Sequence, residues 1–364
     1  MRVAHFADLH LDMPFSWAPP DAARRRRQAL RDTLGAIADL AIRERVDTLL
    51  CGGDLFEHER ITPDTVMFLR STFARIDPIR VFLAPGNHDY YDIPSPYAHV
   101  DWSANVHVFT GGLEPVELEA GLTLWGGGHR VPANTPNLLH GFSVGREGVN
   151  IALFHGSERG WLTAQGENKE PHAPFDAVDI ARAGLDHAFL GHFHAPKDTD
   201  LFTYPGNPDP LSFGEWGERG VVIAEILPDG SVNRSRHRVA VSEVHDVGVD
   251  ISGSSSVQDV RDALSEAVSG LHGFARATLR GELAADVSLD PRELSEVPTD
   301  LQALLIHVGA VIKAYDLEFL AEQATVQGQF IRDIQASPLS EDDKRRVIVT
   351  GLRALDGRQD LEVL

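Results

Sequence analysis

Aspartate, histidine and asparagine recur in five short clusters, each directly after an apolar run that we expect to form a strand. The side chains that could do chemistry are Asp8 and His10 in "ADLHLD", Asp54 in "GGDLF", Asn87, His88 and Asp89 in "PGNHD", His155 in "LFHGS", and His192 and His194 in "GHFHA". Their oxygens and imidazole nitrogens suit Mn²⁺, Fe²⁺ or Zn²⁺ rather than a metal held by thiolates. The sequence therefore predicts a metal site built from strand ends.

The five clusters together contain more ligands than one ion can use. Two ions about 3.5–4 Å apart that share one carboxylate would use them economically. Asp54 is the candidate for the shared carboxylate, because the two glycines before it let the backbone approach closely. In the D-x-H and H-x-H pairs, a spacing of two on an extended segment would aim both side chains at one face. A single cluster of this kind is usually an ordinary turn, so the prediction rests on all five occurring in order.

Alternating strands and helices must bring these clusters together. Residues 2–7, 46–52 and 79–86 read as buried strands, separated by helices over 21–44 and 62–76. We expect Asp21 to cap the first helix, and Thr62 to cap the second with Pro63 in its first turn. Crossovers of this length indicate parallel pairing, and ligands of such sheets lie at the carboxyl ends of the strands.

The pattern of predicted strands and helices changes twice after the third strand. From about residue 105 the strands are closely spaced, and "PDGS" at 228–231 predicts a hairpin, so we expect two packed sheets with helices outside. Beyond about residue 242, two short helical segments alternate with three strands, and helices near 316–335 and 340–355 follow. We therefore predict an α/β domain over 1–242 and a small α+β domain with C-terminal helices over 243–364.

Composition narrows the class of protein. The net charge of −21 disfavours strong non-specific binding of DNA by the free chain, although bound cations or a partner could supply the positive charge. We expect the arginine run at 24–27 to lie on a solvated helix surface, and the single cysteine, Cys51, to be a small buried residue. The chain has no apolar run of about 18 residues, and the first residues include His and Asp, so we expect a cytoplasmic protein without a membrane span.

The order of the clusters resembles that of the calcineurin-like metallophosphoesterase superfamily. Further phrases are similar to bacterial SbcD-type DNA repair exonucleases, most closely their YhaO-like subgroup: "ADLHLD" followed by "PF", "GGDLFE", "YPGNPDPLSFGE" at 204–215, and the tail phrases "GQFIRDI" and "GLRALDGR". The motifs cover residues 1–225. Over 245–364 the resemblance rests on the general pattern of strands and helices and on the two tail phrases.

The resemblance implies a two-sheet metallophosphoesterase sandwich flanked by helices, a small capping domain, and a site for two divalent ions, Mn²⁺ in this family. One ion would take Asp8, His10, Asp54 and His194, and the other Asp54, Asn87, His155 and His192. His88 would face the substrate as a transition-state stabiliser or general acid, with Asp89 orienting its imidazole. A hydroxide derived from water would attack phosphorus in line.

The function that the resemblance implies is a Mn²⁺-dependent DNA exonuclease or endonuclease in DNA repair. It would act as the nuclease subunit beside an SbcC-like coiled-coil ATPase, and as a homodimer. Two alternatives stay open, namely a small-molecule phosphodiesterase or phosphatase with the same site, and a metal-stabilised scaffold that no longer cleaves. The intact ligand set and His88 count against the scaffold, because a scaffold has no use for a substrate-facing imidazole.

One residue departs from the family's pattern. After "GDLF" the family usually has Asp, or His in some nuclease members, whereas this chain has Glu57 followed by His58. Either Glu57 bears on how the substrate strand is cleaved, or it is a solvated loop residue.

Overall fold

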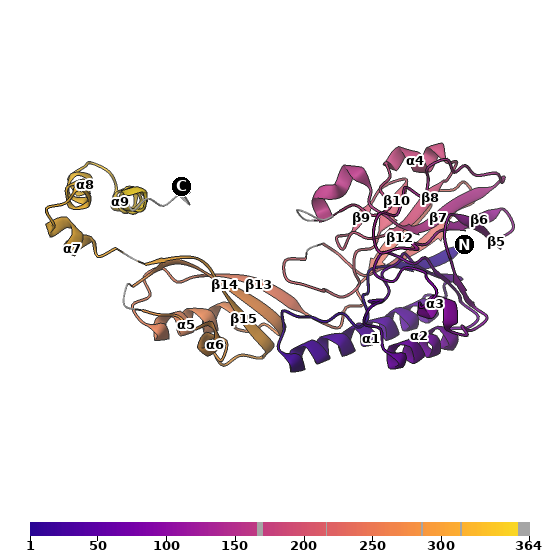
Figure 1. Cartoon of the computed structure of the whole chain (residues 1–364), viewed down its shortest axis with the longest axis horizontal. Coiled ribbons are helices and arrows are strands. Elements are labelled where there is room, and N and C mark those ends of the chain that lie inside the picture. Colours follow the sequence, from indigo (N-terminus) through magenta and orange to yellow (C-terminus); the bar gives the residue numbers. More distant parts are fainter. Residues whose placement is uncertain (166–169, 216, 285–286, 314, 356–364) are drawn as a thin grey trace. The chain divides into compact units, whose positions relative to one another are not determined.

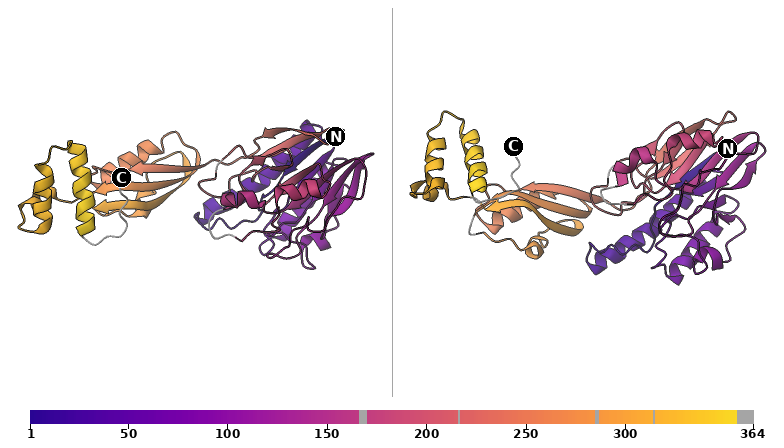
Figure 2. Two further views of the ribbon diagram at one scale, coloured as in Figure 1. Left: turned by 90° about the horizontal axis from the view of Figure 1, so that it is seen from above. Right: turned by 45° about the horizontal axis from the view of Figure 1, so that its top comes forward.

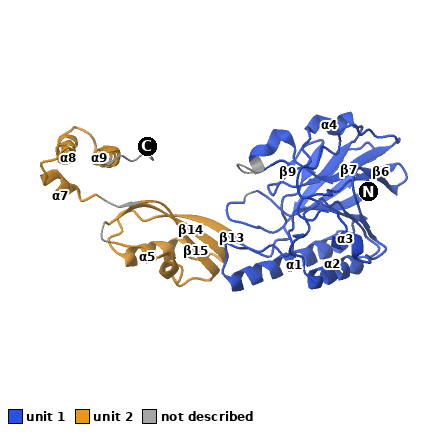
Figure 3. Cartoon of the chain, in the orientation of Figure 1, with its two compact units in different colours: residues 1–244 blue, residues 245–364 orange. Residues whose placement is uncertain are grey.

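The computed structural model describes residues 1–165, 170–215, 217–284, 287–313 and 315–355. The chain forms two compact units, Met1–Val244 and His245–Leu364 (Figure 3). No helix in the described ranges combines the length and the apolar character that crossing a membrane would need.

Unit 1 is built on two sheets, each of six strands among the described residues. The first has the order β12-β11-β1-β2-β3-β4, in which β1 to β4 run parallel and β11 pairs antiparallel with both of its neighbours, β1 and β12. Its strands are β1 (Arg2–Phe6), β2 (Thr48–Cys51), β3 (Arg80–Leu83), β4 (Val106–Val108), β11 (Val221–Ile226) and β12 (Val232–His237). The predicted hairpin joins β11 to β12, since Ile226 pairs with Val232.

The second sheet has the order β5-β6-β7-β8-β10-β9, with a parallel centre formed by β6, β7, β8 and β10. Its strands are β5 (Glu114–Glu119), β6 (Leu122–Gly126), β7 (Val149–His155), β8 (His187–Gly191), β9 (Lys197–Asp198) and β10 (Phe202–Tyr204). Both sheets therefore present a row of parallel strands whose carboxyl ends carry the predicted clusters.

The helices of unit 1 cover the outer faces of the two sheets. α1 (Pro20–Arg43), α2 (Pro63–Arg75) and α3 (Pro96–His99) lie on one side, and α4 (Ala177–Arg182) with the 3₁₀ segment η1 (Arg159–Gln165) on the other (Figure 1). Thr62 caps α2 as predicted, accepting a hydrogen bond from the Thr65 N–H. Asp21 does not cap α1, because the cap position falls on Pro19 and Asp21 lies within the first turn.

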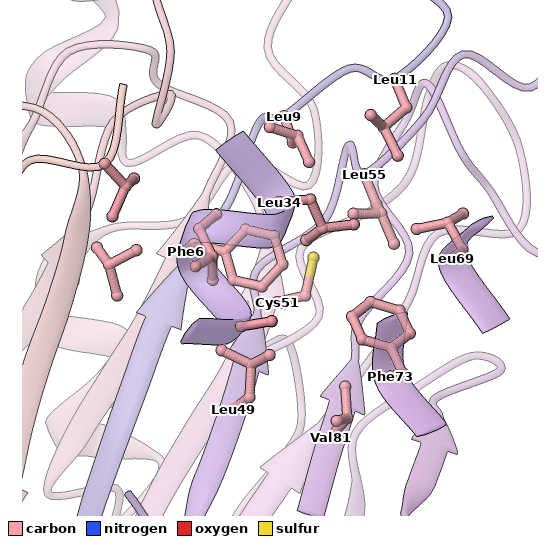
Figure 4. Packing of buried hydrophobic residues seen from close by; sticks show 14 of the residues in the cluster. Phe6, Leu9, Leu11, Leu34, Leu49, Cys51, Leu55, Leu69, Phe73 and Val81 are labelled. Carbon is pink, nitrogen blue, oxygen red and sulfur yellow. The ribbon is translucent and has the colours of Figure 1, made fainter. Parts of the chain in front are cut away.

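Successive side chains of the central strands point to opposite faces of the sheet, and this divides the apolar core into layers. Leu49 and Val81 face α1 and α2, where they pack with Cys51, Leu34 and Phe73 (Figure 4). Their neighbours Leu50 and Phe82 face the opposite way, and meet Leu124, Leu153 and Phe189 of the second sheet. A third cluster lies between the second sheet and α4. This is the two-sheet sandwich with outer helices that was predicted, and Cys51 is buried as expected.

Unit 2 begins with three strands that alternate with two helices. The strands form a sheet of order β13-β14-β15, and the helices pack with it around a separate apolar core. In chain order the elements are β13 (Val244–Asp250), α5 (Val257–Ala267), β14 (Gly273–Leu283), α6 (Pro291–Leu294) and β15 (Leu301–Lys313). Three helices follow within the described part of the tail, α7 (Leu317–Glu322), α8 (Val326–Gln335) and α9 (Glu341–Leu355). α8 and α9 lie side by side (Figure 2).

The single helix predicted over 316–335 is interrupted. The chain leaves helical geometry at Gln323, and α8 starts again after Thr325, whose side chain accepts a hydrogen bond from the Gly328 N–H at 3.1 Å. The tail phrase "GQFIRDI" lies on α8. The phrase "GLRALDGR" starts on α9, and its residues 356–358 lie outside the described residues.

The expectation of a solvated arginine run is wrong for Arg26. Its side chain is 0% exposed and its Nη2 donates to Asp209 Oδ1 at 2.9 Å. The same carboxylate accepts from Thr33 Oγ1 on α1 and from the backbone N–H groups of Val241 and Ser242. One buried carboxylate thus joins α1, the loop after β10 and the segment that leaves unit 1.

Arg26→Ala should lower the free energy of unfolding of unit 1 by about 3–5 kcal/mol, because Asp209 would stay buried without its counter-charge. Thermal unfolding followed by circular dichroism would measure the loss. Arg24→Ala, which removes an exposed arginine of the same run paired with Asp21, is the matched control and should leave the midpoint unchanged. Equal effects of the two substitutions would contradict this role of Arg26.

Candidate metal centre

The strand ends that carry the predicted ligands lie beside one another in each sheet. In the first sheet, β1, β2 and β3 are adjacent and parallel, so the clusters after them share one edge. In the second sheet, β7 ends at His155 and its parallel neighbour β8 ends one residue before His192. The predicted ligands therefore come from five adjoining strand ends.

Two glycines allow the two sheets to meet at this point. A Cβ atom on Gly191, at the end of β8, would collide with the carbonyl oxygen of Gly52, which follows β2. A Cβ atom on Gly52 would come within 2.9 Å of the Gly191 nitrogen. This backbone contact is far closer than the ~10 Å at which sheets usually pack, and it brings the ligands of the two sheets within reach of common ions.

The ligand loops have unusual backbone conformations. The φ angles of Asp8, His10, Asp54 and His192 are 57°, 52°, 51° and 120°. The extended geometry predicted for the D-x-H and H-x-H pairs is therefore wrong. Backbone hydrogen bonds from Asp8 N to Gly53 O and from His10 N to Asp54 O hold the first two loops in this shape. Such strained conformations persist where the surroundings determine them strongly, as they do at functional sites.

One group of donor atoms surrounds the His155 ring. His155 Nε2 lies 3.3 Å from Asp54 Oδ2, 3.2 Å from Asn87 Oδ1 and 3.3 Å from His192 Nδ1. Ligand atoms that share an ion at bonds of ~2.1 Å lie roughly 3.0–3.5 Å apart. His155 Nδ1 donates to the carbonyl oxygen of Gly52 at 2.9 Å, which leaves the Nε2 lone pair available for a cation.

A second group of donor atoms lies around the His10 ring. Donor atoms of Asp8, His10 and His194 lie within 4.8 Å of one another, and His10 Nε2 is 3.7 Å from Asp54 Oδ2. His10 Nε2 is buried and has no hydrogen-bond partner among the described residues, which fits a nitrogen that ligates a cation. Asp54 Oδ2 stands between this group and the His155 group, as a shared carboxylate would. The residues thus fit a pair of divalent ions.

Glu57 binds two histidines at once. Its Oε1 accepts from His10 Nδ1 at 2.8 Å and its Oε2 from His88 Nδ1 at 3.0 Å. These contacts favour a role in the site over a solvated loop residue. They orient His10 Nε2 toward the donor group and leave His88 Nε2 available on the pocket side, where the His88 side chain is 45% exposed.

The prediction that Asp89 orients the His88 imidazole is wrong. Both Asp89 oxygens are occupied elsewhere, accepting from the backbone N–H groups of Gly86, Asp54 and Leu55 and from the Tyr97 hydroxyl. Asp89 is fully buried and holds the loop after β3 against the loop after β2. Glu57 takes the place that the prediction gave to Asp89.

The charges of the cluster are mutually compensating. Burial would raise the pKa of Asp54, but the neighbouring His155 and His88 imidazoles hold it well below its usual value. Burial likewise opposes the charged form of His88, yet Asp54 and Glu57 raise the pKa of His88 to about 9. For Glu57, hydrogen bonds from His10 and His88 overcome burial and lower the pKa to about 2. The carboxylates of Asp54 and Glu57 therefore stay ionised, and without bound ions the neighbouring imidazoles balance their charge.

Three contributors escaped the sequence analysis. Glu215 accepts from His194 Nδ1 at 3.2 Å, which fixes the tautomer of that ring. His129 is buried with its Nε2 2.9 Å from the His155 carbonyl oxygen. His172 lines the pocket, with its ring centroid 5.4 Å from that of His192. The "GGGH" and "SFGE" phrases offered hints, whereas nothing near residue 172 did.

An open pocket of about 630 Å³ lies over the donor atoms. Asp54, Asn87, His88, His192 and His194 form its floor, so a ligand in the pocket would contact the bound ions and His88 together. This volume suits a small organic molecule or one to two nucleotides.

Titration of the metal-free protein with Mn²⁺ should raise its melting temperature, because ligand bound to the folded state stabilises it by about 2.7 kcal/mol at a hundredfold excess over the dissociation constant. Elemental analysis after desalting should find two ions per chain in the wild type. Asp54→Asn should lose both ions, since both groups use this carboxylate, whereas Asp32→Asn on the exposed face of α1 should keep them. Retention of two ions by Asp54→Asn would contradict a shared Asp54.

Asp89→Asn should destabilise unit 1 by about 2 kcal/mol or more, because an amide cannot accept all four hydrogen bonds and leaves buried donors unsatisfied. Tyr97→Phe, which removes one of the four donors, should cost about 1 kcal/mol. Chemical denaturation of both variants tests this, and a fully stable Asp89→Asn would show that the carboxylate does not organise the loops.

The chain is similar in sequence to several known proteins. A family model described as calcineurin-like phosphoesterase matches residues 1–196. The uncharacterized metallophosphoesterase YhaO of Bacillus subtilis is 27% identical over 237 residues, covering 61% of this chain and 56% of that protein. The DNA double-strand break repair protein Mre11 of Methanopyrus kandleri is 25% identical over 339 residues, covering 83% and 69%. A component of the nuclease SbcCD of Rhodobacter capsulatus is 26% identical over 278 residues, covering 62% and 66%.

The chain thus spans little more than half the length of YhaO and about two thirds of the other two relatives. The family model, in contrast, accounts for more than half of this chain and contains all the predicted ligands. The chain belongs to the calcineurin-like phosphoesterase family, whose members hydrolyse phosphoesters at a site for two divalent metal ions.

Proposed function

We propose that this protein is a Mn²⁺-dependent nuclease that hydrolyses phosphodiester bonds of DNA in DNA repair. The observation that carries the proposal is the position of His88, which shares an open pocket with the donor atoms for two ions and is held there by Glu57. Two of the relatives, a double-strand break repair protein and a component of a nuclease, support DNA as the substrate.

In this proposal the two ions divide the donor atoms as the sequence suggested. One would be held by Asp8, His10, Asp54 and His194, and the other by Asp54, Asn87, His155 and His192. When bound, the ions would activate water and neutralise the charge that develops on the phosphoryl oxygens. Three acceptors hold the ligand rings in place by binding their Nδ1 atoms. Glu57 binds His10, Glu215 binds His194 and the Gly52 carbonyl oxygen binds His155.

His88 is the catalytic residue that contacts the substrate. Its Nδ1–H is held by Glu57, so Nε2 is the nitrogen that would donate to a phosphoryl or leaving-group oxygen. Glu57 is a positioning residue, because it acts on the substrate only through the two rings that it holds.

The net charge of the protein favours a partner that binds DNA, and the resemblance to SbcD-type proteins suggests its kind. A chain of net charge −21 needs help to hold a polyanion. We propose an SbcC-like coiled-coil ATPase as the partner that grips DNA, with unit 2 as a capping domain, and a cytoplasmic homodimer as the working form.

A small-molecule phosphodiesterase or phosphatase is the second candidate. One observation favours it: the described residues that line the pocket include no lysine or arginine that could hold the flanking phosphates of a strand.

A nuclease assay in Mn²⁺ separates the two candidates. End-labelled single- and double-stranded oligonucleotides and bis(4-nitrophenyl) phosphate would be offered to the wild type, Asp54→Ala and His88→Ala, with and without an ATPase partner. We expect DNA cleavage that both substitutions abolish, and that persists in the exposed-residue controls Asp32→Ala and His140→Ala. Hydrolysis of the small ester with intact DNA would replace the nuclease by the phosphodiesterase.

Glu57→Gln should lower kcat about 10–100-fold at saturating Mn²⁺, because the amide cannot accept from both His10 and His88 and the catalytic ring loses its orientation. Metal occupancy and melting temperature, measured on the same sample, should stay near the wild-type values, which separates positioning from a structural effect. An unchanged kcat would show that Glu57 does not position His88.

A further inference from the structure

One wall of the pocket is apolar and has no part in the chemistry described so far. Met13, Leu211 and Phe213 line the same cavity as His88 and His194. Leu211 is buried, while Met13 and Phe213 are partly exposed. A ligand whose phosphate lies on the ion-binding floor would therefore place its neighbouring group against this wall.

The wall is tied closely to the candidate ligands. Met13 closes the turn after His10, with its backbone N–H donating to the His10 carbonyl oxygen at 3.1 Å. Phe213 lies two residues before Glu215, which accepts from His194 Nδ1. The wall thus lies on the side of the site where His10 and His194 would hold one of the ions.

An aromatic residue supports the wall from behind. Trp17 Nε1 donates to the Leu211 carbonyl oxygen at 3.3 Å, and the Trp17 ring meets that of Phe213 edge-on at 4.7 Å between centroids. The loop that carries Leu211 and Phe213 is anchored at its start by the buried Asp209–Arg26 pair. Phe213 is therefore presented as a rigid surface, which costs little ordering on binding.

The charges around the pocket restrict what this wall could accept. Glu170 and Glu215 also line the cavity, and its described lining residues include no lysine or arginine. Glu215 is already paired with Arg219 Nη1 at 2.9 Å. The described lining therefore offers a second anionic group beside the wall no lysine or arginine as a partner, whereas an uncharged planar group would gain by leaving water. The site thus separates an anion-binding floor from a surface for a flat apolar group, which matches the two halves of a nucleotide.

We infer that Met13, Leu211 and Phe213 form the subsite for the nucleobase next to the cleaved phosphodiester, with Phe213 as the stacking residue. The inference rests on the proposed function and adds to it the part of the substrate that the wall recognises. Stacking on an aromatic ring accepts every base, because each base has a π face. The subsite therefore confers preference for a nucleotide over other phosphodiesters, without preference for sequence.

The test compares intact oligonucleotides with matched ones that carry an abasic nucleotide on either side of the cleaved bond. KM is measured for cleavage, and the dissociation constant is measured by fluorescence anisotropy with Mn²⁺ in a His88→Ala background. In the wild type we expect an abasic nucleotide at one of the two positions to weaken binding about tenfold, within the range of a base–aromatic stack. In Phe213→Ala this difference should fall to less than twofold, and Phe213→Tyr should restore it.

Phe319→Ala is the matched control, since Phe319 is an exposed phenylalanine of α7 in unit 2, and it should keep the tenfold difference. DNA cleavage that depends on Asp54 and His88, with equal abasic penalties in the wild type and Phe213→Ala, would overturn the subsite alone. Absence of DNA cleavage alongside hydrolysis of bis(4-nitrophenyl) phosphate would overturn the proposed function, and the nucleobase subsite with it. Circular dichroism of each variant identifies any that has failed to fold.

Discussion

The contact between Gly52 and Gly191 is the constraint on which the site depends. Two stacked sheets normally stand apart by the length of their interleaved side chains, and here the side chains are missing at the one place where β2 and β8 end. Asp54 from the first sheet can therefore stand beside His155 and His192 from the second. A methyl group at either glycine would separate the two halves of the ligand set while leaving the hydrophobic layers of both sheets complete.

The ligand loops show how the fold itself holds such a site in shape. Four candidate ligands have φ angles in a region that residues with a side chain rarely adopt, and each such residue costs of order 1–3 kcal/mol. The Asp89 carboxylate offsets part of this cost by binding three backbone N–H groups of two loops, and the Asp8 carboxylate accepts the His192 N–H from the other sheet. The acids of the site thus have two tasks, since Asp89 fixes the backbone alone, whereas Asp8 both fixes the backbone and is a candidate metal ligand.

Much of this architecture could be predicted from local sequence. Apolar runs ending in Asp, His or Asn located the strands and the donor residues. This worked because a strand and the turn after it are determined by a few residues that are adjacent in the sequence. The failures have a common cause. Arg26 is buried by Asp209, 183 positions later, and His88 is held by Glu57, 31 positions earlier. Such pairs depend on which loops the finished fold brings together. Asp89 was misassigned for the same reason, since adjacency in sequence suggested a contact with His88 that the turn geometry does not allow.

The loop between β10 and β11 connects two features that otherwise look unrelated. Near its start, Asp209 holds the N–H groups of Val241 and Ser242, where the chain prepares to leave unit 1, and six residues later Glu215 holds the ring of His194. Tension applied to the chain beyond residue 242 would load this loop directly. A segment of only a few residues therefore links the exit of unit 1 to His194, one of the candidate metal ligands.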